Sequence, residues 1–111
     1  MQDCIFCRIA AHEAPATIVH EDDAVVAFED IGHRAPFHVL VIPRRHVASL
    51  ADADAETIGR VGAAAAGVAK AAGYLETGYR VVANVGPDAG QSVPHLHFHV
   101  LGGRSLGWPP G

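Results

Sequence analysis

The sequence predicts an α+β domain with a five-stranded, mainly antiparallel sheet, one long helix and one short helix. Five apolar segments follow one another in hairpin-like succession, which favours antiparallel pairing. A long segment with apolar residues at helical spacing separates the third of these from the fourth. A chain of 111 residues has room for one core, so residues 1–111 are expected to form a single domain.

The first half of the chain is expected to hold the short helix and three strands. Asp3 is placed as the N-cap of the helix, and Pro43 closes the third strand because proline has no N–H to donate to a neighbouring strand. The expected elements are a helix at 5–11, strands at 17–20 and 24–29, a loop at 30–36 and a strand at 38–43.

The second half is expected to hold a helix at 53–72, a strand at 79–85, a glycine-containing loop at 86–91 and a final strand at 95–101. Because one face of the helix is made mostly of small residues, either the sheet or a partner helix can approach it closely. Gly73 is expected just after its C-terminus. The face consists of Ile58, Val61, Gly62, Ala65, Val68, Ala69 and Ala72.

Three histidines alternate with apolar residues near the C-terminus. In an extended strand, this spacing places His95, His97 and His99 on one face and the residues between them on the other. The alternative is an edge strand whose polar face happens to be histidine, but three such positions by chance are improbable. The row therefore indicates a functional site.

Neutral imidazole attacks phosphorus well and exchanges a proton near pH 7. His97 has a histidine on each side, so it is our candidate nucleophile. His38, at the start of the third strand, is placed to receive a hydrogen bond from the row. Just before the row, Asn84, Gly90, Gln91 and Ser92 offer donors for phosphate oxygens or a leaving group, although this stretch alone also fits an ordinary polar turn.

The composition of the chain argues against binding to nucleic acids and to membranes. A formal charge of −4 and a pI near 6.0 argue against a nucleic-acid-binding surface. We expect no membrane association and a cytoplasmic location, since no apolar run has spanning length and no signal sequence opens the chain.

Cys4 and Cys7 have the spacing of a metal-binding or redox pair. A redox motif ordinarily opens a longer helix after a strand, which is not expected here. A closed tetrahedral zinc site needs two more ligands, and His46 and His95 are the best candidates. Two inert buried thiols are the remaining alternative.

These motifs resemble the histidine triad (HIT) family, and most closely its Hint branch of nucleoside phosphoramidate hydrolases. The resemblance runs nearly end to end. It rests on Cys4-Ile5-Phe6-Cys7-Arg8-Ile9, Glu21-Asp22-Asp23, Ala27-Phe28-Glu29-Asp30-Ile31, Ala35-Pro36-Phe37-His38, Val41-Ile42-Pro43, Gly90-Gln91-Ser92, the histidine row and Leu101-Gly102-Gly103-Arg104.

The resemblance implies a role for each matching residue. His97 would form a covalent nucleotidyl-histidine that water later cleaves, and His38 would orient it. His99 and Ser92 would serve the phosphate and leaving group, and His95 opens the triad. The remaining matches are Asp30 with the ribose hydroxyls, Asn84, Gly90 and Gln91 on the phosphate side, and Ile5, Phe6, Ile9, Phe28 and Ile31 in an apolar slot for a purine.

The resemblance also implies a HIT-like fold, a homodimer and a structural zinc. The dimer would join two sheets into one, with the long helices packed across the interface. In bacterial members with this cysteine spacing, zinc is held at the positions of Cys4, Cys7, His46 and His95.

Three functions remain open from the sequence. The leading one is hydrolysis of the P–N bond of purine nucleoside phosphoramidates, which are conjugates of AMP or GMP. The alternatives are a dinucleoside polyphosphate hydrolase and a zinc-stabilised nucleotide-binding or interaction module with little turnover. Gly102-Gly103-Arg104 and the Trp108-Pro109-Pro110 tail favour the Hint branch.

Overall fold

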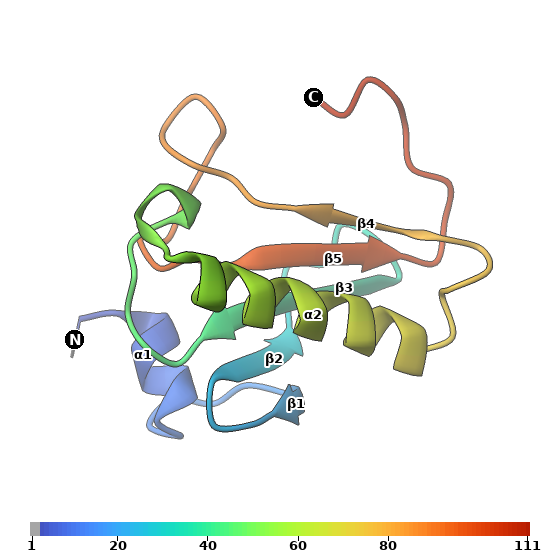
Figure 1. Cartoon of the computed structure of the whole chain (residues 1–111). Helices are drawn as coiled ribbons and strands as arrows, with labels where there is room; N and C mark the ends of the chain where they lie inside the picture. The colour runs from blue at the N-terminus through green and yellow to red at the C-terminus, as the bar shows by residue number, and fades with distance from the viewer. Residues whose placement is uncertain (1–2) are drawn as a thin grey trace.

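The computed structural model describes residues 3–111, which form a five-stranded antiparallel sheet with a helix against each face (Figure 1). The strand order is β1-β2-β3-β5-β4, so β5 lies inside the sheet and β1 and β4 are its edges. The predicted fold class is confirmed. The elements are α1 (Ile5–Ala10), β1 (Ile18–Glu21), β2 (Val25–Glu29), β3 (Phe37–Pro43), a 3-10 helix (Leu50–Asp52), α2 (Ala55–Ala71), β4 (Tyr79–Val82) and β5 (Phe98–Gly102).

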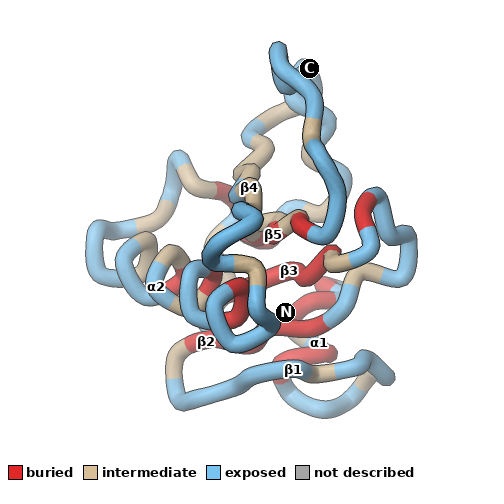
Figure 2. Tube along the Cα trace, turned by 90° about the vertical axis from the view of Figure 1, so that its right-hand side faces the viewer, coloured by how far each residue is buried: buried red, intermediate tan, exposed pale blue. Residues whose placement is uncertain are grey.

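Because successive side chains of a strand point to opposite faces of the sheet, each face carries its own apolar cluster. On one face, buried residues of α2 such as Val61 and Ala65 pack against Val39, Val41 and Val100. Figure 2 shows that the buried positions concentrate in the central strands and on the inner side of each helix.

The second cluster lies under α1. Phe6 and Ile9 pack against Phe28, Leu40 and Ile42 on the opposite face of the sheet. The short N-terminal helix is therefore part of the core, although it has only six residues.

The small-residue face of α2 covers the sheet of its own chain. Val61, Ala65, Val68 and Ala69 are buried there. Of the two partners expected for this face, the sheet of the same chain is therefore confirmed for these four residues. Ala72 of the same face is exposed, and a helix contact across a dimer stays a prediction. Gly73 has a φ of +91° directly after the helix cap, as predicted.

Cys4, and not Asp3, is the N-cap of α1. Its sulfur accepts a hydrogen bond from the backbone N–H of Cys7 at 3.4 Å. The prediction of Asp3 was wrong because the helix begins at Ile5 and the residue before it has the extended backbone of a cap.

The last two strands are shorter than predicted. Val82 is paired with His99, and the ladder does not continue beyond this pair. The backbone N–H of His95 donates to Val93 and that of Leu96 donates to Val47, so neither bonds to a neighbouring strand. The 3-10 helix at Leu50–Asp52 was not predicted. None of the helices in residues 3–111 is long and apolar enough to cross a membrane.

Candidate functional site

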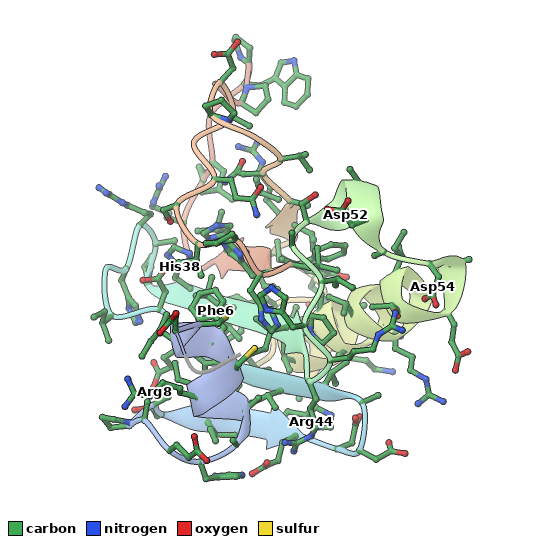
Figure 3. The ribbon with its side chains drawn as sticks, turned by 90° about the vertical axis from the view of Figure 1, so that its left-hand side faces the viewer. Phe6, Arg8, His38, Arg44, Asp52 and Asp54 are labelled. Atoms are coloured by element: carbon green, nitrogen blue, oxygen red, sulfur yellow. The ribbon has the colours of Figure 1, made fainter. Side chains whose placement is uncertain are left out.

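The histidine row keeps its predicted alternation although β5 begins only at Phe98. Leu96 and Val100 are buried in the α2 cluster. His95 and His97 point the other way, and the ring centroid of Phe6 lies 5.9 Å and 5.2 Å from theirs. In Figure 3, Phe6 projects from α1 on this side of the sheet, where His38 also lies. The row therefore faces α1.

A backbone carbonyl fixes the proton on His97. Its Nδ1 lies 2.8 Å from the carbonyl oxygen of His95, and the ring is almost fully buried. Because a carbonyl only accepts, Nδ1 must carry the hydrogen. A neutral ring then leaves its lone pair on Nε2, so Nε2 is the atom able to attack an electrophile.

A second chain of hydrogen bonds fixes the protons of His38 and His99. The backbone N–H of Arg34 donates to Nδ1 of His38 at 3.0 Å, so the hydrogen of the neutral ring is on Nε2. His38 Nε2 lies 2.9 Å from Nδ1 of His99 and donates to it. His99 therefore carries its own hydrogen on Nε2. His38 thus donates to the row, whereas the sequence analysis expected it to receive, and its partner is His99.

Burial keeps this pair uncharged. It lowers the pKa of His99 from 6.5 to about 4, with further lowering by the neighbouring His97 and His38. Burial also lowers the pKa of His38, against the opposing effect of the Asp30 carboxylate. At neutral pH, His99 is therefore a neutral hydrogen-bond donor.

Asp30 lies beside this pair at the end of β2. Its Oδ1 accepts from the backbone N–H of Gly32 at 2.7 Å, and its Oδ2 is 3.4 Å from Nε2 of His38. The three side chains also satisfy the spacing of a metal cluster. His38 and His99 are hydrogen-bonded to each other and Asp30 accepts from Gly32, so each of the three has a partner without an ion.

The four predicted metal ligands come together. Nδ1 of His95 lies 3.3 Å from the sulfur of Cys4, 3.5 Å from that of Cys7 and 3.2 Å from Nδ1 of His46. Nδ1 of His46 is 3.3 Å from the Cys7 sulfur. Tetrahedral zinc with ordinary bond lengths separates such ligand atoms by about 3.3 to 3.8 Å. The donor set and its spacing therefore fit zinc.

The proton arrangement also fits a metal. Nε2 of His95 lies 2.9 Å from the carbonyl oxygen of Pro43 and donates to it, which leaves the lone pair of Nδ1 directed at the cluster. Burial raises the pKa of the Cys7 thiol, and Cys4 raises it further. A cation between the two sulfurs would offset both effects by stabilising the thiolates.

The loop before the row is braced by Gln91. Its side-chain amide donates to the carbonyl oxygens of Ala48 and Val93 and accepts from the N–H of Gly86. These bonds commit Gln91 to the shape of the loop. Asn84 is half-buried, and Gly90 and Ser92 are exposed.

The five residues predicted to form an apolar slot divide into two groups. Phe6, Ile9 and Phe28 are buried in the α1 cluster, whereas Ile5 is 41% exposed and Ile31 is fully exposed. The ring of Phe6 packs edge-on against that of Phe28 with centroids 5.4 Å apart. The buried three can form the floor of a slot, and Ile5 and Ile31 have the exposure that walls require.

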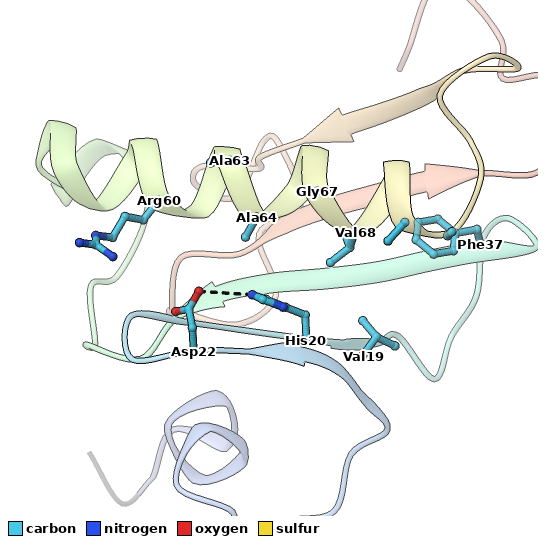
Figure 4. Close-up of a pocket in the computed structure, with 11 residues that line it drawn as sticks. Val19, His20, Asp22, Phe37, Arg60, Ala63, Ala64, Gly67 and Val68 are labelled. Atoms are coloured by element: carbon cyan, nitrogen blue, oxygen red, sulfur yellow. Dashed lines mark hydrogen bonds and ion pairs between the residues drawn. The ribbon is translucent and has the colours of Figure 1, made fainter.

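A groove of about 670 Å³ lies on the opposite face of the sheet, between α2 and β1 (Figure 4). Its lining includes Val19, Phe37 and Val68, together with the His20–Asp22 hydrogen bond of 3.3 Å. It includes none of the predicted site residues. His12 and His33, like His20, are exposed and lie beside carboxylates of the surface.

Several contacts that define the site were not foreseen. The carbonyl of Pro43 and the N–H of Arg34 are backbone groups, which leave no residue-specific signal in a sequence. Arg104 was noted only as part of a motif, yet its guanidinium donates to the carbonyl oxygen of Arg34.

Comparison with known proteins identifies the family. The model of the HIT domain matches residues 11–106. The chain belongs to the HIT family. An uncharacterized HIT-like protein of Synechococcus elongatus is 49% identical over 99% of this chain and 98% of its own length.

Two further relatives have more informative names. A 14 kDa zinc-binding protein of Zea mays is 46% identical over 96% of this chain and 87% of its own length. A HIT family hydrolase from Legionella pneumophila has a solved structure that superposes with a TM-score of 0.95 at 46% identity, covering 98% of this chain and all of that one. The predicted family and fold are confirmed, and the chain resembles hydrolases of that family.

The low pKa of His99 predicts a loss of stability in acid. Between about pH 6.5 and pH 4 the unfolded chain binds a proton at His99 that the native protein does not, so the free energy of unfolding falls as the pH is lowered through this window. Urea denaturation of wild type and His99→Gln at several pH values measures the effect. The substitution should reduce the slope, and equal slopes would contradict the prediction.

Proposed function

We propose that this HIT protein hydrolyses purine nucleoside phosphoramidates through a covalent nucleotidyl-histidine. The observation that carries the proposal is the proton arrangement of His97, whose Nδ1–H is held by the His95 carbonyl while Nε2 keeps its lone pair. A neutral imidazole held this way is oriented for attack before substrate arrives.

In the first step, Nε2 of His97 forms a bond to phosphorus and the P–N bond to the amine breaks. The ring of His97 gains positive charge, which the carbonyl of His95 stabilises through Nδ1–H. The Nε2–H of His99 donates to a phosphate oxygen. The departing amine takes a proton from the exposed hydroxyl of Ser92, which regains one from water.

In the second step, water adds to phosphorus and the bond to Nε2 of His97 breaks. The nucleoside monophosphate leaves with the oxygen of that water, and the released proton passes to solvent. Asp30 would hold the ribose hydroxyls, since one carboxylate can accept from both. The purine would lie over Phe6 between Ile5 and Ile31.

Adenosine phosphoramidate and diadenosine tetraphosphate distinguish the two enzymatic hypotheses. AMP release from the first, in excess over the second, supports the proposal. Release mainly from the second would favour a polyphosphate hydrolase, and release from neither would favour a binding module.

Replacement of His97 by Ala should remove nearly all turnover, with at least a hundredfold loss of kcat being the order expected for a nucleophile. AMP binding, measured by calorimetry, should remain. His33→Ala is the matched control, because His33 is an exposed histidine near the same site and should leave kcat unchanged.

Mass spectrometry of the acid-labile intermediate, quenched at neutral pH, identifies the attacking residue. A nucleotide adduct on the peptide bearing His97 is expected. An adduct localised to His95 or His99 by fragmentation would overturn the assignment.

We also propose that the zinc for which this cluster is suited has a structural role. Cys4, Cys7, His46 and His95 fill all four positions of a tetrahedral site, which leaves none for a reactive water. When bound, the ion would tie α1 to the segment after β3 and to the start of the histidine row. Because the site requires reduced thiols, we propose a cytoplasmic location.

Removal of zinc should therefore lower the melting temperature, because the ligands are dispersed in the unfolded chain. Elemental analysis should find one zinc per chain, and Cys7→Ser should reduce both zinc content and melting temperature. A chelator should have little further effect on that variant. Wild-type protein that contains no zinc and melts unchanged in chelator would refute the site.

We propose a homodimer that joins the sheets through β4. This strand is an edge of the sheet, and exposed apolar residues surround it. Leu75, Val81, Val85 and Trp108 are between 41% and 82% exposed, and Arg80 of β4 lies 6.0 Å from the Trp108 ring.

Light scattering at micromolar concentration should give twice the chain mass of 11.6 kDa. Val81→Lys places a charge at the proposed interface and should shift the protein toward the monomer. Val19→Lys is the matched control, because Val19 has similar exposure on the opposite edge strand, β1. A wild-type monomer, or equal dissociation by both variants, would contradict the proposal.

A further inference from the structure

Arg104 joins the end of β5 to the loop at 30–36. Its Nη2 and Nε lie 2.7 Å and 3.2 Å from the carbonyl oxygen of Arg34, and its Nη1 lies 3.0 Å from that of Ser105. Two N–H groups of one side chain therefore hold a single carbonyl oxygen that is 70 positions away in the sequence.

Gly103 makes this contact possible. Its φ is +91°, and a Cβ added there would lie 2.9 Å from Cβ of Pro36, closer than two carbon atoms can pack. The backbone before Arg104 therefore rests directly on the loop, so the guanidinium reaches Arg34 across a short gap.

Arg34 connects the side chain of Arg104 to His38. The residue whose carbonyl is held by Arg104 has a backbone N–H that donates to Nδ1 of His38 at 3.0 Å. Nε2 of His38, on the other side of the ring, faces both His99 at 2.9 Å and Asp30 at 3.4 Å. The N–H of Arg34 thus occupies the lone pair of Nδ1, and the Asp30 carboxylate beside Nε2 favours the same position of the hydrogen.

We propose that Arg104 is a positioning residue that fixes the proton arrangement of the His38–His99 pair through Arg34. With Arg34 held, His38 has its hydrogen on Nε2 and donates to His99, so His99 presents Nε2–H. If the loop is released, Nδ1 of His38 loses its donor and can take the proton. His38 then accepts from His99, which presents a bare Nε2 that repels a phosphate oxygen.

This inference deepens the proposed function, and its kinetic part rests on it. The proton arrangement itself is independent of any activity. Because Arg104 is exposed, its hydrogen bonds contribute little to the free energy of unfolding, and its removal should leave the melting temperature nearly unchanged.

Two variants of the zinc-loaded protein test the proposal. Arg104→Met removes the donors, and Arg60→Met makes the same change at an exposed arginine of α2 that contacts only Glu56 and Asp23 among the ion pairs described. Long-range 15N–1H spectra report which ring nitrogen of each histidine is protonated, with His38 assigned from the missing signals of His38→Gln. No substrate is required.

Wild type and Arg60→Met should show His38 and His99 protonated at Nε2. In Arg104→Met, the Nδ1 and Nε2 signals of His38 should move toward averaged values, and Arg104→Lys, which keeps one donor group, should lie between. Unchanged ring signals in a folded Arg104→Met would overturn the proposal, as would equal changes in Arg60→Met.

Kinetics with adenosine phosphoramidate provide the second measurement. Arg104→Met should lower kcat roughly tenfold, as expected when a reacting group is misplaced, while KM stays within about twofold. A rise in KM alone would contradict the positioning role. If wild type shows no turnover, the proposed function fails, and the ring signals still decide whether Arg104 controls His38.

Discussion

His95 is the residue on which the rest of the site depends, because each of its polar groups holds a different part of it. Its Nε2–H is bound by the carbonyl of Pro43, and its Nδ1 faces the sulfurs of Cys4 and Cys7. Its own carbonyl fixes Nδ1 of His97. A displacement of this residue would therefore disturb the predicted metal cluster, the end of β3 and the hydrogen bond that orients the ring of His97.

The second half of the site depends on burial more than on charge. His99 is placed where desolvation, with His97 and His38 beside it, holds its pKa near 4, and His38 is buried beside it. Two adjacent imidazoles that both accepted a proton would repel each other at 2.9 Å. In neutral rings, the position of the hydrogen on one imidazole instead determines its position on the next. The hydrogen of His38 therefore decides whether Nε2 of His99 donates or accepts a hydrogen bond.

The fold was predictable because its signals are periodic and local. Side chains of the histidine row alternate between the two faces even at His95 and Leu96, which pair with no neighbouring strand. The burial of Leu96 is enough to fix the face on which His95 lies. The ends of the strands were less predictable because a strand ends where its neighbouring strand stops pairing with it. Strand β4, for example, ends at Val82, which pairs with His99 of β5. Asp3 was predicted as the N-cap because aspartate is a common capping residue. The N-cap is instead Cys4, because it is the residue directly before the first residue of the helix.

The site was predictable as a set of residues but not as a set of protons. The spacing of the two cysteines, together with the family resemblance for His46 and His95, was enough to name four residues from three distant segments that lie together. The direction of every hydrogen bond in the row, however, is set by the backbone carbonyls of His95 and Pro43, which any residue could supply, and by the backbone N–H of Arg34, which any residue except proline could supply. A sequence shows which imidazoles can meet, whereas the backbone around them decides which ring nitrogen keeps a lone pair and which donates a hydrogen bond.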